Sequence, residues 1–62
     1  MSMGQDAQNI ATILVQRGHA AGEQLFVAVC VDRKHSQAEA YQLAGKARSI
    51  YMAMTIMAGG AA

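Results

Sequence analysis

The sequence predicts an all-α fold, and three observations support this. The composition is 53% hydrophobic and contains no Pro, which suits helices. A Ser36–Glu39 pair precedes the longest periodic stretch, and the glycines Gly59 and Gly60 follow it. We therefore expect a helical hairpin, with a long helix over about 36–58 packed antiparallel on a helix or broken helix over about 6–32.

The long helix has the clearest start signal. In a capping box the Ser36 hydroxyl accepts from the N–H of Glu39, and the Glu39 carboxylate accepts from the N–H of Ser36. Apolar residues then recur at intervals of three and four, which predicts a seam along one face. The row Gly45, Ser49 and Ala53 is expected to admit a close neighbour. The seam consists of Ala40, Leu43, Ala47, Ile50, Met54 and Met57.

The first half of the chain leaves two alternatives open. Residues 1–4 are expected to fray, with Ser2 or Asp6 capping the first helix. That helix either ends at Gly18 or continues through residues 18–22, where the hydrophobic phase does not break.

Residues 25–31 are also ambiguous. Their valines alternate as in a strand, but the chain offers no second strand, so a strand here would have to pair across a dimer. We favour a helix, because the heptad phase runs through this segment. The alternative is an α-β-α chain.

Self-association follows from the hairpin. A short polar turn over residues 32–35 makes the helices antiparallel, so that Leu25 faces Leu43 and Leu14 faces Met54. Apolar side chains remain in water, and burying one is worth about 1.5–3 kcal/mol. We therefore expect a homo-oligomeric bundle, a dimer or larger. Residues expected in the core or the oligomer interface are Leu14, Leu25, Phe26, Leu43, Ile50, Met54 and Met57.

The remaining composition sets limits on function. The 62 residues suffice for a single small helical domain with a net charge of +1, and the lone Cys30 excludes an intrachain disulfide. The longest apolar run is far too short to span a membrane, and the N-terminus has no signal-peptide pattern. We expect a cytoplasmic protein with no membrane partner.

No catalytic or metal site is expected. Cys30, Asp32, His35 and His19 are the possible metal ligands, but their spacing does not match a zinc site. Asp32, His35 and Ser36 are better explained by the turn and the cap than by nucleophilic catalysis. We therefore predict no cofactor and no enzymatic activity.

One set of residues has recognition potential. Tyr41, Arg48 and Tyr51 lie nearly in line on the long helix, and an Arg beside aromatic rings can stack a base and bind a phosphate. Alternatively, the tyrosines pack at an interface and Arg48 is solvated or pairs with Glu23. The full candidate ligand-binding set is Tyr41, Lys46, Arg48, Tyr51, Arg33 and Lys34.

The expected function is therefore non-enzymatic. We predict an interaction or inhibitor-type protein that acts as a small homo-oligomer and binds another macromolecule, most simply a protein. Chains of this size without a site are typical of adaptors and inhibitors, including those of phages and mobile elements. The alternative is an oligomer that binds a nucleotide or nucleic acid through the Arg, Lys and Tyr stripe.

Overall fold

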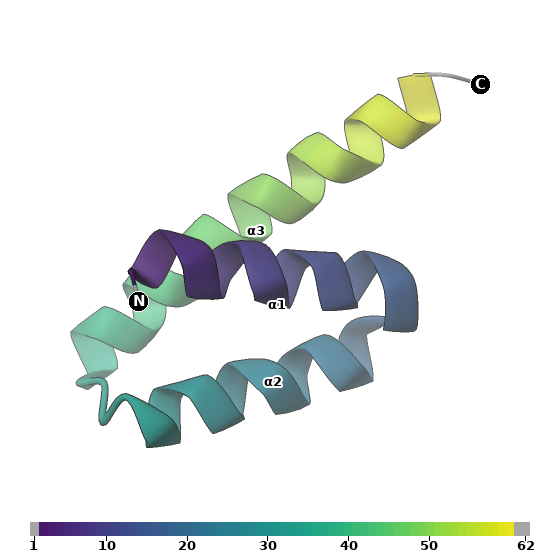
Figure 1. The fold of residues 1–62 in the computed structure, drawn as a ribbon. Coiled ribbons are helices and arrows are strands. Elements are labelled where there is room, and N and C mark those ends of the chain that lie inside the picture. The colour runs from purple at the N-terminus through teal and green to yellow at the C-terminus, as the bar shows by residue number, and fades with distance from the viewer. Residues whose placement is uncertain (1, 61–62) are drawn as a thin grey trace.

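Three helices make up the computed structural model, which describes residues 2–60. They are α1 (Met3–Arg17), α2 (His19–Asp32) and α3 (Gln37–Gly60), as Figure 1 shows. No strand occurs between residues 2 and 60, so the all-α prediction is confirmed. Residues 25–31 lie within α2, and the α-β-α alternative is wrong because a helix satisfies its backbone hydrogen bonds without a partner strand.

The N-terminus of α1 is more ordered than predicted. Met1 lies outside the described residues, but Met3 and Gly4 are helical, so the expected fraying is wrong for them. Ser2 is the N-cap, and its hydroxyl accepts from the N–H of Gln5 at 3.2 Å. The other candidate cap, Asp6, lies inside the helix and is buried.

Gly18 reverses the chain between α1 and α2. Its φ of 92° is a conformation that side chains disfavour and glycine tolerates. The Gly18 N–H donates to the Leu14 carbonyl, and the Gly18 carbonyl accepts from the Gly22 N–H, both at 3.1 Å. This single residue ends one helix and begins the next, which resolves the open alternative in favour of a break. The two helices therefore run antiparallel (Figure 1).

Gly22 allows α1 and α2 to approach closely. A Cβ atom at this buried position would lie 2.6 Å from the Leu14 Cγ and 3.5 Å from the Leu14 Cα. Gly18 and Gly22 thus have different roles, one in the turn and one in packing.

The turn between α2 and α3 closes α2 with a Schellman motif. Lys34 has a φ of 54°, the left-handed conformation. The His35 N–H donates to the Cys30 carbonyl at 3.0 Å, and the Lys34 N–H donates to the Val31 carbonyl at 3.2 Å. The last carbonyls of α2 are therefore satisfied without a glycine.

The predicted capping box begins α3. The Ser36 N–H donates to Oε1 of Glu39 at 2.9 Å, and the Glu39 N–H donates to the Ser36 hydroxyl at 3.2 Å. The far end of α3 runs through Gly59 to Gly60, two residues beyond the predicted stop.

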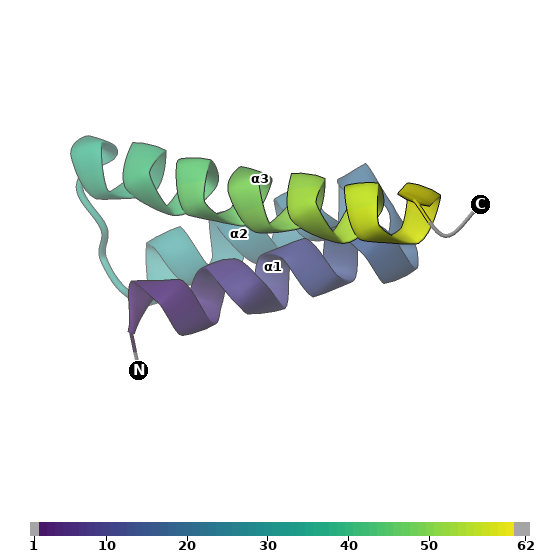
Figure 2. The same cartoon turned by 90° about the horizontal axis from the view of Figure 1, so that it is seen from above.

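The core lies between α1 and α3, which run in roughly the same direction (Figures 1 and 2). Ala7 and Ile10 of α1 are buried against Leu43 and Ala47 of α3. The alanines bring the two helix axes together, so α1, rather than α2, supplies the main packing surface for α3.

This arrangement corrects part of the predicted hairpin. Residues 6–32 are not one rod facing α3, because Gly18 turns α1 back along α2. The antiparallel register predicted for the α1 half of this segment is therefore wrong, since α1 runs in roughly the same direction as α3 (Figure 1). Only the α2 half of the segment runs antiparallel to α3.

The seam of α3 is buried at one end only. Leu43 and Ala47 are buried, Ile50 and Met54 are half-buried, and Met57 is 76% exposed. The C-terminal part of α3 diverges from the other two helices, as Figure 1 shows. Apolar surface on that part of the helix is therefore left uncovered by the described residues of the same copy.

The two helix-interior glycines are expected to respond oppositely to alanine. At Gly45 a Cβ would meet nothing within 4 Å, so Gly45→Ala should stabilise the fold by about 1 kcal/mol through helix propensity. Gly22→Ala forces Leu14 to move and should destabilise by about 1–3 kcal/mol. Urea denaturation followed by circular dichroism measures both. Equal effects of the two variants would contradict the close α1–α2 packing.

The capping box predicts a pH dependence. Hydrogen bonds from the backbone and then the hydroxyl of Ser36 lower the pKa of Glu39 below its ordinary 4.5, with a smaller contribution from His35. A lowered folded pKa stabilises the fold above about pH 4.5, and this contribution is lost as the pH falls through the folded value. Glu39→Gln should therefore reduce the loss of unfolding free energy as the pH falls through the folded pKa of Glu39. If the free energy of unfolding of Glu39→Gln and of the parent protein fell equally with decreasing pH, the stabilising role of the Glu39 carboxylate would be refuted.

Candidate functional site

A groove of about 570 Å³ opens where the three helices meet. Its lining is mostly apolar, with Ile10 and Leu14 from α1 lying between residues of α2 and α3. The polar side chains that reach it are His19, Glu23 and Arg48. The residues that α2 and α3 contribute are His19, Gly22, Glu23, Phe26, Ala44, Ala47, Arg48, Tyr51 and Met52.

An aromatic contact joins α2 to α3 in this groove. The ring centroids of His19 and Tyr51 are 5.6 Å apart, with an angle of 64° between the planes. This edge-to-face geometry is a favourable arrangement for two rings. Tyr51 is half-buried, so only part of its ring is open to a ligand.

Two opposite charges lie on the α2 and α3 sides of the groove. Glu23 is on α2 and Arg48 is on α3, and both are exposed. Among the described residues, no ion pair within 4 Å joins them. Arg48 is therefore solvated in this structure and available to a molecule that enters the groove.

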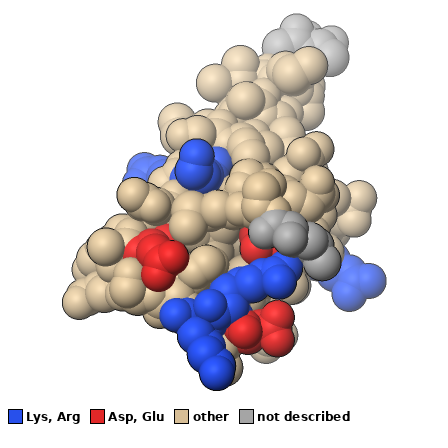
Figure 3. Space-filling view, turned by 60° about the vertical axis from the view of Figure 1, so that its left-hand side comes forward, with Lys and Arg blue, Asp and Glu red and all other residues tan. Residues whose placement is uncertain are grey.

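The predicted ligand-binding set is divided. Arg48 and Tyr51 line the groove together, whereas Tyr41 is 71% exposed and lies outside it. Lys46 lines a separate shallow depression beside Gly45 and Ser49. Figure 3 shows basic side chains in separate groups, interspersed with acidic ones, on the face it presents. That face is therefore not a continuous basic surface.

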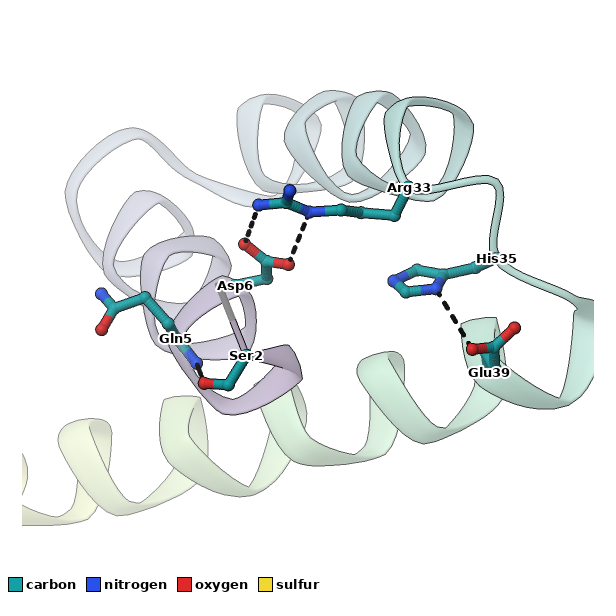
Figure 4. Close-up of polar contacts among 6 residues, drawn as sticks. All are labelled: Ser2, Gln5, Asp6, Arg33, His35 and Glu39. Atoms are coloured by element: carbon teal, nitrogen blue, oxygen red, sulfur yellow. Dashed lines mark hydrogen bonds and ion pairs between the residues drawn. The ribbon is translucent and has the colours of Figure 1, made fainter.

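Arg33 has a structural contact instead of a free guanidinium. Its Nε and Nη2 donate to the two carboxylate oxygens of Asp6 at 3.2 and 3.3 Å (Figure 4). Asp6 is only 4% exposed, and this pairing satisfies both of its oxygens. The hydrogen bond, followed by the charge of Asp6, raises the pKa of Arg33 above its ordinary value. Lys34, the next residue, is exposed in the turn.

Sequence reasoning missed the Asp6–Arg33 pair. Asp6 was a candidate N-cap, and Arg33 a candidate ligand residue. The available signal was an acid within the apolar face of α1, at one residue before Ala7 and four before Ile10. A buried acid on such a face requires a cation, and the α2–α3 turn holds the nearest ones in the folded chain.

His35 lies beside the cap of α3. Its Nδ1 is 3.7 Å from Oε2 of Glu39, and its Nε2 is buried without a hydrogen-bond partner among the described residues (Figure 4). Between residues 2 and 60, no three His, Cys, Asp or Glu side chains come close enough together to hold a metal ion. Cys30 is half-buried and forms no disulfide.

Comparison with protein-family models, with curated proteins and with solved structures gives no match to this chain. None of the helices between residues 2 and 60 combines the length and the hydropathy needed to cross a bilayer.

Arg33→Met is expected to destabilise the fold much more than Lys34→Met. The first change leaves the buried Asp6 carboxylate unpaired, whereas the second removes an exposed charge. Thermal unfolding followed by circular dichroism compares the two variants. The double variant Asp6→Asn with Arg33→Met should recover part of the loss, because the uncompensated charge is gone. A double variant as unstable as Arg33→Met would contradict this account.

Proposed function

We propose that this chain is a non-enzymatic interaction protein that works as a small homo-oligomer and binds another macromolecule, in the manner of an inhibitor or adaptor. The single observation that supports the proposal is apolar surface left uncovered along α3. Met52, Ile56 and Met57 are 49%, 69% and 76% exposed, and Met52 also lines the apolar groove. Contiguous apolar surface of this kind is typical of interaction sites.

Exposed apolar side chains also occur at the other end of the molecule. Val31, near the end of α2, is 72% exposed, and Tyr41, in the first turns of α3, is 71% exposed. The surface around the α2–α3 turn is thus separated from Ile56 by most of the length of α3. An oligomer that covers the C-terminal part of α3 keeps the turn end free, and we assign that end to the second macromolecule.

Nucleotide or nucleic-acid binding is the weaker candidate. Of its six predicted residues, only Arg48 and Tyr51 share the groove, and Arg33 is engaged by Asp6. Tight nucleic-acid binding requires several phosphate contacts, and the basic side chains here do not converge. The interaction proposal needs no such convergence, because buried apolar area drives association.

The oligomer is tested by size-exclusion chromatography with light scattering over a range of concentrations. We expect a mass that is a multiple of the 6.5 kDa chain. Ile56→Gln should shift the protein towards the monomer, because it replaces an apolar contact, whereas Val31→Gln should not. A stable monomer at every concentration would refute the homo-oligomer.

A further inference from the structure

We propose that the groove is filled by α3 of a second copy of this chain, in a two-fold dimer with Met52 at the axis. This inference deepens the proposed function and rests on it. In such a dimer the two α3 helices run antiparallel, and each lies between the α2 and α3 helices of the other copy. The result is a four-helix centre, with the α1 helices on the outside.

The exposed area of one copy supports this occupant. The chain exposes 4400 Å², whereas a folded monomer of 6.5 kDa is expected to expose about 3800 Å². A standard interface covers about 800 Å² on each partner. The exposed area above that expected for a monomer is thus most of the area that one side of a stable dimer must cover.

The α3 residues that line the groove belong to the same row as the exposed α3 residues that would fill the groove of a second copy. Arg48 and Met52 line the groove, and Ile56 follows them at the same spacing of four residues on the exposed part of α3. Residues four apart form one row on a helix, and such rows pack against each other across helix pairs. The groove and the segment that fits it therefore belong to one self-complementary surface, as a two-fold interface requires.

Charge favours one register of the two helices over another. With Arg48 at the axis, two guanidinium groups would oppose each other. With Met52 at the axis, the stem of Arg48 lies against Ile56 of the second copy, and its charge lies towards the last turn of that copy's α3. No basic residue occurs in that turn in the described part of α3, and the partial negative charge of a helix C-terminus favours a cation.

Disulfide cross-linking tests the register. We would introduce Met52→Cys in a Cys30→Ala background and oxidise the protein mildly. Helices whose axes lie about 8–10 Å apart bring facing Cα atoms within disulfide range. We expect a cross-linked species at twice the 6.5 kDa chain mass on a non-reducing gel. Met52 is half exposed, so the change spares the core, and circular dichroism checks the helix content.

Two control positions define the face and the register. Ala53→Cys lies at the same level on a different face of α3, and Tyr41→Cys lies about 33 Å from its symmetry mate along the antiparallel helices. Neither should cross-link. A dimer in light scattering that does not cross-link at position 52, or cross-links equally at 53, would overturn this arrangement but leave the homo-oligomer standing. A monomer would refute both proposals.

Discussion

The reversal at Gly18 determines which helices can touch. With a φ of 92° at this one residue, α1 folds back along α2 and comes to lie against α3. The close approach then depends on small residues, with Gly22 beneath Leu14 and with Ala7 beside the α3 seam. If the chain ran straight through Gly18, α1 would extend beyond the end of α2 and lose both contacts.

The ion pair between Asp6 and Arg33 holds the start of α1 against the end of α2. It joins the first turns of α1 to the residue that follows α2, and these residues are 27 apart in the sequence. A buried carboxylate is costly unless paired, so the pair favours the fold-back over a straight rod. The same contact removes Arg33 from the surface charges that a phosphate could use. Arg48 is left as the basic side chain in the groove.

Local signals predicted the helices, whereas the packing of α1 against α3 and the Asp6–Arg33 pair went unpredicted. The Ser36–Glu39 cap and the spacing of Leu43 and Ala47 depend on neighbours within one helix, so sequence reasoning found them. The direction of α1 depends on one backbone angle at Gly18, which a continuous hydrophobic phase does not reveal. The candidate ligand-binding residues are divided for a related reason: Arg33 pairs with Asp6, and Lys46 lines a different depression from Arg48. Which side chains share a groove depends on how the helices pack.

The small size of the core favours the proposed self-association. Among the described residues the buried apolar side chains are Ala7, Ile10, Ala11, Leu43 and Ala47, and three of these are alanine. Alanines permit close helix approach but contribute little buried area, so one copy gains little free energy from its interior. The larger apolar side chains, such as Met52 and Ile56, are on the outside of α3. Covering them adds to stability what the alanine-rich interior cannot supply, so folding and assembly of this chain are expected to be coupled.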